Sequence, residues 1–309
     1  MEKQVIDKLK YLINKKKTTE EIKDILGLED YEIFGLVYLL KQEGLPYEII
    51  NGQIIKVKIP ELLNNDVKTI NVDNKDEFCF LSDIHYASIY DRPDIVRRIY
   101  EECHERGIST IFCCGDVTDG YYPSRKDSLK KVRCSYADDQ IDYVINTHPY
   151  DKDIAFYMIG GNHDYSHVRN ENIDVLKKIS EQRKDMVYLG QDEANIQINR
   201  LKIKLFHGDC NRRSLLSSNA ENFIKTIPFK ERPDILQLGH IHRSFFMKSG
   251  NINVFQTGSL LDETPYIHDN KIDSERTCWF AQIKYDSDGN IIQIVPELHD
   301  YGKSLVRKR

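Results

Sequence analysis

The sequence has no hydrophobic run long enough to cross a membrane. No stretch approaches the roughly 18–20 consecutive apolar residues of a membrane-spanning helix. The first residues, Met1-Glu2-Lys3-Gln4, also lack the apolar centre of a secretory signal. We therefore expect no membrane partner.

The chain also lacks paired cysteines. None of its seven cysteines forms a C-x-x-C pair, and several lie in apolar runs such as Phe78-Cys79-Phe80. A reduced cysteine in such a run packs as a small hydrophobic residue. This pattern predicts a reducing compartment, and so a cytoplasmic location.

Neither sign of charge dominates the composition. The 44 Lys and Arg residues face 49 Asp and Glu residues, so the formal net charge is −5. This balance argues against a protein that binds polyanions with its whole surface, but it leaves room for a local basic patch. The 309 residues exceed the usual single-domain length of about 100–200 residues, which predicts two domains.

Residues 1–60 are predicted to form a small helical domain closed by a β-hairpin. Periodic apolar residues indicate three helices, and Thr18 and Glu21 form a capping-box pattern at the start of the second. The hairpin turns at Asn51-Gly52, a strong two-residue turn signal. Three helices followed by a hairpin resemble a winged helix-turn-helix domain.

The charges of this domain leave its partner open. Residues 1–60 contain ten cations and ten acidic residues, a difference of zero, and the third helix opens with the acidic segment Glu29-Asp30-Tyr31-Glu32. A recognition helix for DNA needs donors that reach phosphates and base edges. Lys56 and Lys58 of the hairpin could still contact a DNA backbone. The alternatives are contact with DNA and contact with a protein partner.

The rest of the chain divides by its hydrophobic pattern. Residues 61–76 are polar and predict a linker, and residues 301–309 form a basic tail. Between them, residues 77–300 alternate apolar runs with helical patterns and then become rich in short strands. This succession predicts an α/β (α+β) domain with two packed sheets flanked by helices.

Five short polar segments in this domain carry the chemistry. Because ligands gather at the carboxyl ends of strands in α/β sheets, segments that follow apolar strands can converge there. Carboxylates, a carboxamide and imidazoles suit Mn²⁺, Fe²⁺ or Zn²⁺ better than Mg²⁺ alone. Two such cations about 3.5–4 Å apart would favour displacement at phosphorus. The segments are Asp83-Ile84-His85, Gly115-Asp116-Val117-Thr118-Asp119, Gly161-Asn162-His163-Asp164, His207-Gly208-Asp209 and Gly239-His240-Ile241-His242.

Taken in this order, the five segments resemble the motifs of the calcineurin-like metallophosphoesterase family, over about residues 77–300. The resemblance implies a four-layer αββα sandwich that binds two divalent metal ions, with Mn²⁺ expected first and Fe²⁺, Zn²⁺ or Ni²⁺ as alternatives. The implied ligands are Asp83, His85 and His242 for the first metal, Asn162, His207 and His240 for the second, and Asp116 as a bridge between them.

The same resemblance implies the catalytic roles. A hydroxide held between the metals would attack phosphorus, and His163, which is not a ligand, would protonate the leaving group. Asp164 would orient the imidazole of His163. Asp119 and Asp209 are candidates for orienting metal-bound histidines, with simple loop capping as the alternative.

Four residues are candidates for substrate contact. Tyr86 and Arg243 adjoin predicted ligands, and Arg125 and Lys126 lie in a cationic, tyrosine-bearing segment directly after the second motif. Cations and aromatic rings beside a phosphoester site can follow a nucleic-acid backbone and stack its bases. An exposed structural role is the alternative for each.

These features favour a metal-dependent phosphodiesterase that acts on DNA or RNA, that is, a nuclease. The acidic net charge and the acidic third helix favour two alternatives, a phosphodiesterase for a small nucleotide and a phosphatase for a phosphoprotein. A third alternative is a regulator that binds DNA or protein and keeps a vestigial metal site. Loss of turnover on removal of the His163 side chain, with metal content unchanged, would distinguish an enzyme from such a regulator.

Overall fold

The computed structural model describes residues 2–15, 17–42, 47–50, 52–56, 67–72, 76–124, 130–208, 216–269 and 274–302. The chain divides into two compact units, Met1–Leu62 and Leu63–Arg309. Among the helices of these described segments, none is both long and apolar enough to cross a bilayer.

The first unit contains the predicted succession of helices and hairpin, with α1 (Glu2–Asn14), α2 (Thr19–Leu26), α3 (Asp30–Gln42) and the antiparallel strands β1 (Tyr47–Ile50) and β2 (Gln53–Lys56). The capping box is confirmed, because Thr18 Oγ1 accepts the Glu21 N–H at 3.2 Å and Glu21 accepts the Thr18 N–H at 2.9 Å. Asn51 of the turn lies outside the described residues. The resemblance to a winged helix stays a prediction.

One small apolar core joins the elements of this unit. Leu9 of α1, Ile22 of α2, Ile33 and Leu40 of α3 and Ile54 of β2 are all buried together. Apolar side chains at helical spacing therefore face a shared interior, as the sequence pattern predicts.

The second unit is built on two six-stranded sheets. The β4 sheet has the order β14 (Ile291–Asp300), β13 (Thr277–Tyr285), β4 (Glu77–Leu81), β5 (Thr110–Cys113), β6 (Ala155–Gly160) and β7 (Met186–Gln191). The β10 sheet has the order β11 (Phe245–Ser249), β12 (Ile252–Gln256), β10 (Ile235–Leu238), β9 (Leu201–Phe206), β8 (Glu193–Ile198) and β3 (Val67–Thr69).

Strand β3 corrects one prediction. Residues 61–76 were expected to form a linker, but β3 pairs in parallel with β8 at the edge of the β10 sheet. Ile70 and Val72, which follow β3, are buried in the core between the sheets. Residues 67–72 are therefore part of the second unit. Their alternating apolar positions were obscured by the polar residues between them.

Alternate residues of β4 show how the layers pack. Cys79 and Leu81 face a core shared with helices α4 (Pro93–Arg106), α5 (Ala137–Thr147) and α7 (Val175–Gln182). Phe78 and Phe80 face the other way, into the core between the two sheets. Successive side chains of a strand point to opposite faces, so one strand serves both layers.

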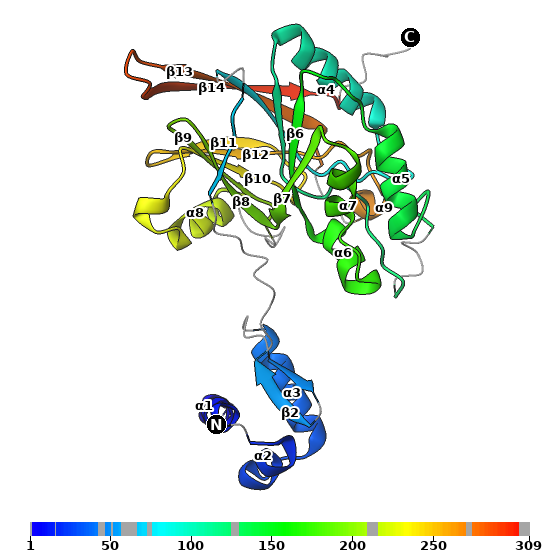
Figure 1. The fold of residues 1–309 in the computed structure, drawn as a ribbon, viewed down its shortest axis with the longest axis vertical. Coiled ribbons are helices and arrows are strands. Elements are labelled where there is room, and N and C mark those ends of the chain that lie inside the picture. The colour runs from blue at the N-terminus through cyan, green and yellow to red at the C-terminus, as the bar shows by residue number, and fades with distance from the viewer. Residues whose placement is uncertain are drawn as a thin grey trace. The chain divides into compact units, whose positions relative to one another are not determined.

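A further helix covers the other sheet. Ala220 and Ile224 of α8 (Leu216–Thr226) are buried against Leu236 of β10 and Val254 of β12. The order of layers is helices, sheet, sheet, helix (Figure 1). The predicted α/β fold with an αββα sandwich is confirmed. The remaining elements are α6 (Asn162–Glu171), α9 (Pro265–Asp269) and the 3₁₀-helix η1 (Phe229–Glu231).

A buried histidine joins α4 to the end of α5. The ring of His148 is 4% exposed and lies between two hydroxyls, with Nδ1 3.1 Å from Tyr86 Oη and Nε2 2.9 Å from Tyr100 Oη. A neutral imidazole has one donor and one acceptor, so it can bond both hydroxyls. Burial, and then the nearby Arg183 guanidinium, lower the pKa of His148 to about 3.

The core between the sheets provides a first prediction. Phe80 is fully buried, with its ring centroid 5.2 Å from that of Phe255. Replacing it by alanine in Phe80→Ala should lower the free energy of unfolding by about 3–5 kcal/mol. Urea unfolding followed by the fluorescence of Trp279, the single tryptophan, which lies in the same core, measures this change. Phe229→Ala, at a side chain that is 81% exposed, is the control and should change it by less than about 0.5 kcal/mol.

The buried histidine provides a second prediction. An unfolded histidine has a pKa of about 6.5, whereas that of His148 is about 3 in the folded chain. Below pH 6.5 the unfolded state therefore binds a proton that the folded state does not. The contribution of neutral His148 to the free energy of unfolding is fully present above pH 6.5. It falls by roughly 1.4 kcal/mol per pH unit as the pH drops towards 3.

The measurement compares urea unfolding at pH 7 and pH 5, with a chelator present, for the parent chain and His148→Gln. The parent should lose about 2 kcal/mol more than the variant over this interval. Equal losses in both proteins would show that His148 does not govern the acid sensitivity.

Candidate metal centre

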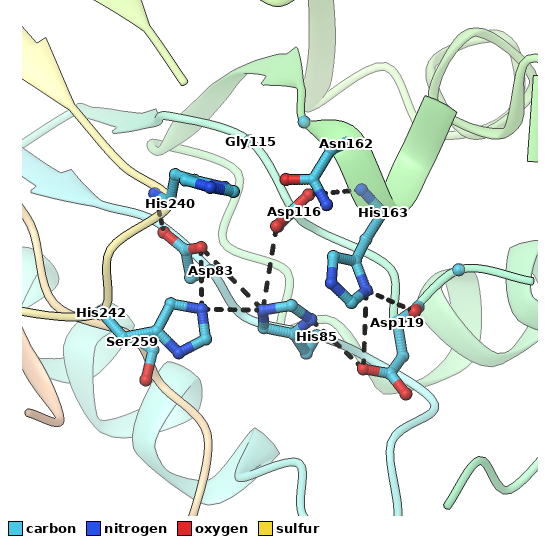
Figure 2. Close-up of polar contacts among 12 residues, drawn as sticks. Asp83, His85, Gly115, Asp116, Asp119, Asn162, His163, His240, His242 and Ser259 are labelled. Atoms are coloured by element: carbon cyan, nitrogen blue, oxygen red, sulfur yellow. Dashed lines mark hydrogen bonds and ion pairs between the residues drawn. The ribbon is translucent and has the colours of Figure 1, made fainter. Parts of the chain in front are cut away.

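The five polar segments meet where the strands of both sheets end. Strands β4, β5 and β6 run parallel in one sheet, and β9 and β10 run parallel in the other. Each predicted segment follows the carboxyl end of one of these strands. Loops from two sheets therefore surround one site (Figure 2).

The backbone of these loops is unusual in conformation. Five non-glycine residues have left-handed φ angles, namely Asp83 at 54°, His85 at 52°, Asp116 at 52°, His240 at 74° and His242 at 58°. Such a conformation costs roughly 1–3 kcal/mol for each residue and persists only where surrounding contacts impose it. Two of those contacts join neighbouring loops, since Asp83 N–H donates to Gly115 O and His85 N–H donates to Asp116 O, both at 3.0 Å.

One group of ligand atoms comes from the first and last segments. His242 Nε2 is 3.1 Å from Asp83 Oδ1 and 3.3 Å from His85 Nε2, and His85 Nε2 is 3.9 Å from Asp83 Oδ1. These separations are below twice the metal–ligand distance of about 2.0–2.2 Å. Asp83, His85 and His242 therefore fit around one cation.

A second group forms around His207. Its Nδ1–H donates to Cys114 O at 2.6 Å, which leaves Nε2 of the neutral ring with its lone pair. That Nε2 lies 3.2 Å from Asp116 Oδ2 and 3.2 Å from Asn162 Oδ1. A ring nitrogen of His240 lies within 4.8 Å of a carboxylate oxygen of Asp116 and of a ring nitrogen of His207. These residues fit around another cation.

The carboxylate of Asp116 lies between the two groups. Its Oδ2 is 3.2 Å from His207 Nε2 and 3.9 Å from His85 Nε2. Its Oδ1 accepts the backbone N–H of His163 at 2.8 Å, which fixes the carboxylate in this position. One carboxylate therefore faces ligand atoms of both groups.

Carboxylates and imidazoles at the site stabilise one another's charged forms. Burial opposes ionisation of Asp83 and Asp116, yet the neighbouring imidazoles, His242 for Asp83 and His207 for Asp116, hold both pKa values below their usual range. Burial likewise opposes a charge on His207, but Asp116 raises its pKa to about 10. Buried carboxylates with imidazole nitrogens against them are a donor set that divalent cations bind on displacing protons.

His163 lies at the edge of the site. It is the second residue of α6, and its side chain is 27% exposed. Its Nδ1–H donates to the backbone oxygen of Asp119 at 2.6 Å. Its ring meets that of His85 edge-on, with centroids 4.5 Å apart (Figure 2). The group that orients this imidazole is therefore the main chain at Asp119.

This arrangement corrects the predicted role of Asp164. Its carboxylate contacts no ring atom of His163 among the described contacts, and accepts instead from the N–H groups of Val117, Thr118 and Gly161 at 3.2, 2.8 and 2.9 Å and from the Thr118 hydroxyl at 2.8 Å. Burial, and then Asp116, raise the pKa of Asp164 to about 6. The physical reason is position: Asp164 is the third residue of α6, and its side chain turns back to the start of the helix.

Asp119 lies where the sequence predicted a partner for a metal-binding histidine. Its Oδ1 is 3.2 Å from His85 Nδ1, so it can accept the proton of that nitrogen and leave Nε2 to the site. Asp209, the other residue proposed for this role, lies outside the described residues.

The predicted substrate residues are only partly placed. Tyr86 is fully buried and its hydroxyl bonds His148, so the prediction of substrate contact is wrong for this residue. The segment turns at His85 so that the next side chain enters the core. Arg243 is half-buried beside His242. Arg125 and Lys126 lie outside the described residues.

The role of Gly161 emerges only from the structure. Its φ is −111°, which other residues also adopt, so the backbone conformation does not require glycine. A Cβ at this position would overlap the Asp116 carboxylate and lie 2.8 Å from His207 Cε1. The site therefore needs glycine here because the ligands approach the backbone closely.

Comparisons with known proteins agree with this architecture. Residues 77–270 match the calcineurin-like phosphoesterase superfamily domain. A comparison with curated proteins finds no match.

Three similar solved structures share little sequence with this chain. A novel archaeal phosphodiesterase shares 15% identity with a TM-score of 0.42, over 72% of this chain and 99% of that chain. Vacuolar protein sorting 29 from Cryptosporidium parvum shares 15% identity with a TM-score of 0.40, over 73% and 98%. A putative 5′-nucleotidase from Staphylococcus aureus shares 13% identity with a TM-score of 0.45, over 72% and 54%.

At these values the structural resemblances say nothing about the reaction. The family match covers more than half of the chain, and it includes all five segments that surround the site. By this match, the chain belongs to the calcineurin-like phosphoesterase superfamily.

Proposed function

We propose that this protein hydrolyses phosphodiester bonds with two divalent cations bound at the site described above. The observation that carries the proposal is the position of Asp116 Oδ2, which lies 3.2 Å from His207 Nε2 and 3.9 Å from His85 Nε2. A carboxylate shared by two sets of ligands is the arrangement that a pair of cations requires. Mn²⁺ is the proposed metal, with Fe²⁺, Zn²⁺ or Ni²⁺ as alternatives.

The proposed ligands follow the two groups. The first cation would be bound by Asp83, His85 and His242, the second by Asn162, His207 and His240, and both by Asp116. When bound, the cations supply Lewis-acid polarisation of the phosphoryl oxygens and activation of a water nucleophile.

His163 is proposed to donate a proton to the leaving oxygen. Its Nδ1–H is committed to Asp119 O, so Nε2 is the nitrogen that can exchange a proton with substrate. Its side chain is 27% exposed and so can meet a substrate, whereas the His85 and His207 side chains are at most 2% exposed. Asp119 and Asp164 act indirectly, by fixing His163 and the loops around it.

The proposed substrate is a nucleic acid, DNA or RNA. Support comes from the tyrosine-bearing segment after the second motif, which lies beside His163. The first unit would contact DNA or a protein partner.

The test of this function is Mn²⁺-dependent cleavage of end-labelled single- and double-stranded DNA and of an aryl phosphodiester. The parent should cleave, and His163→Ala should lose roughly 10²–10⁴-fold in kcat, the usual contribution of a general acid. Metal content, measured by plasma emission spectrometry, should be the same in both proteins. A parent that hydrolyses none of these esters with any of the four metals would refute the proposal.

The bridging role of Asp116 makes a separate prediction. Asp116→Asn removes the negative charge between the two groups while it keeps the side-chain volume. The variant should retain fewer metal ions per chain after dialysis and lose more than the ~10–100-fold in activity that is typical of residues behind the ligands. Asp94→Asn, at an exposed carboxylate paired with Arg92, is the matched control. Unchanged metal content in Asp116→Asn would contradict the bridging role.

A further inference from the structure

A tyrosine lies beside His163, the group proposed to protonate the leaving oxygen. The ring of His163 meets His85 at a centroid distance of 4.5 Å and Tyr122 at 5.3 Å, both edge-on, at 89° and 75°. His85 belongs to the first group of ligand atoms. Tyr122 therefore contacts the same imidazole that meets a ligand of the first group.

The chain before Tyr122 is fixed against α6. Gly120 has a left-handed φ of 81°, and a Cβ there would lie 2.5 Å from Ser166 Oγ and 2.6 Å from His163 O. Tyr121 N–H donates to Ser166 Oγ at 2.7 Å, and Asn170 Nδ2 donates to Tyr121 O at 2.7 Å. These contacts hold the backbone before Tyr122 in position even when no substrate is bound. This lowers the entropic cost of binding a ligand to the Tyr122 ring.

The side chain of Tyr122 is suited to contact a ligand. It is half-buried, and its hydroxyl makes a long hydrogen bond of 3.5 Å to Asn162 O. The preceding residue adds further aromatic rings nearby, because the ring centroid of Tyr121 lies 5.6 Å from that of Tyr136, which is 61% exposed. A preformed aromatic surface beside a phosphate site is suited to planar groups attached to the phosphate.

We propose that Tyr122 is a specificity-determining residue that stacks on the nucleobase of the leaving group, so that the substrates are base-bearing phosphodiesters. The inference rests on the proposed function, because it places the leaving group beside His163. A base offers a π-face to the tyrosine ring, whereas the aliphatic side chain of a phosphoserine or phosphothreonine offers none. Stacking tolerates any base, so little sequence preference is expected.

The experiment compares two substrates that differ only in one group on the phosphate. Thymidylyl-thymidine carries a second nucleoside where the methyl ester of thymidine monophosphate carries a methyl group. The kcat/KM values for release of that group, with Mn²⁺ present, give a selectivity ratio. The proteins are the parent, Tyr122→Leu, Tyr122→Phe and the control Tyr150→Leu, whose side chain is 69% exposed and precedes β6 at its amino end.

The parent should prefer the dinucleotide, and Tyr122→Leu should lower the selectivity ratio by at least about five-fold. Most of the loss should appear in KM, since stacking stabilises the bound substrate and the transition state alike. Tyr122→Phe should keep most of the selectivity, because it keeps the ring, and Tyr150→Leu should match the parent. Equal unfolding midpoints for all four proteins exclude a general loss of structure.

Two results would overturn the inference and leave the function standing. In one, the parent hydrolyses both esters but Tyr122→Leu has the parent's selectivity ratio. In the other, Tyr122→Phe loses as much selectivity as Tyr122→Leu, which would assign the effect to the hydroxyl. A parent that hydrolyses neither ester with Mn²⁺, nor the aryl phosphodiester, would overturn the function and the inference together.

Discussion

The carboxylate of Asp116 is the group on which the rest of the site depends. Its Oδ2 faces His207 and His85, and its Oδ1 accepts the N–H of His163. One side chain thus fixes the spacing of the two groups of ligand atoms and the position of His163 relative to both. The left-handed backbone at Asp116 directs this side chain inward, and the strain is maintained by hydrogen bonds between the loops.

A second buried carboxylate maintains the loops themselves. Asp164 accepts hydrogen bonds from the second segment, at Val117 and Thr118, and from the third, at Gly161. Because it is buried close to Asp116, its negative charge is disfavoured, as its raised pKa shows. The arrangement therefore stores electrostatic strain in exchange for a fixed distance between two loops. A residue that the sequence associated with the His163 ring instead joins the second segment to the third.

The sequence pattern was sufficient where the deciding contacts are local. The capping box at Thr18 and Glu21 needs only neighbouring residues, and it is present. It was insufficient where a distant segment decides the outcome. Residues 67–72 look like part of a polar linker in the sequence, but in the structure β3 pairs with β8. The sequence suggested that Tyr86 contacts substrate, but in the structure its hydroxyl bonds the His148 ring, which also bonds Tyr100.

The sequence by itself determined which atoms are available: seven proposed ligand side chains in five short segments, each after an apolar strand. It also indicated the strands and helices from which the sandwich is built, because period-two and helical patterns depend on near neighbours along the chain. Only the tertiary structure decided how those atoms meet. The packing of the strands brings side-chain atoms from far apart in sequence to within 4 Å of one another, and left-handed turns direct five of these side chains. The partners of Asp164 and the placement of Tyr122 beside His163 follow from that packing, which no local pattern encodes.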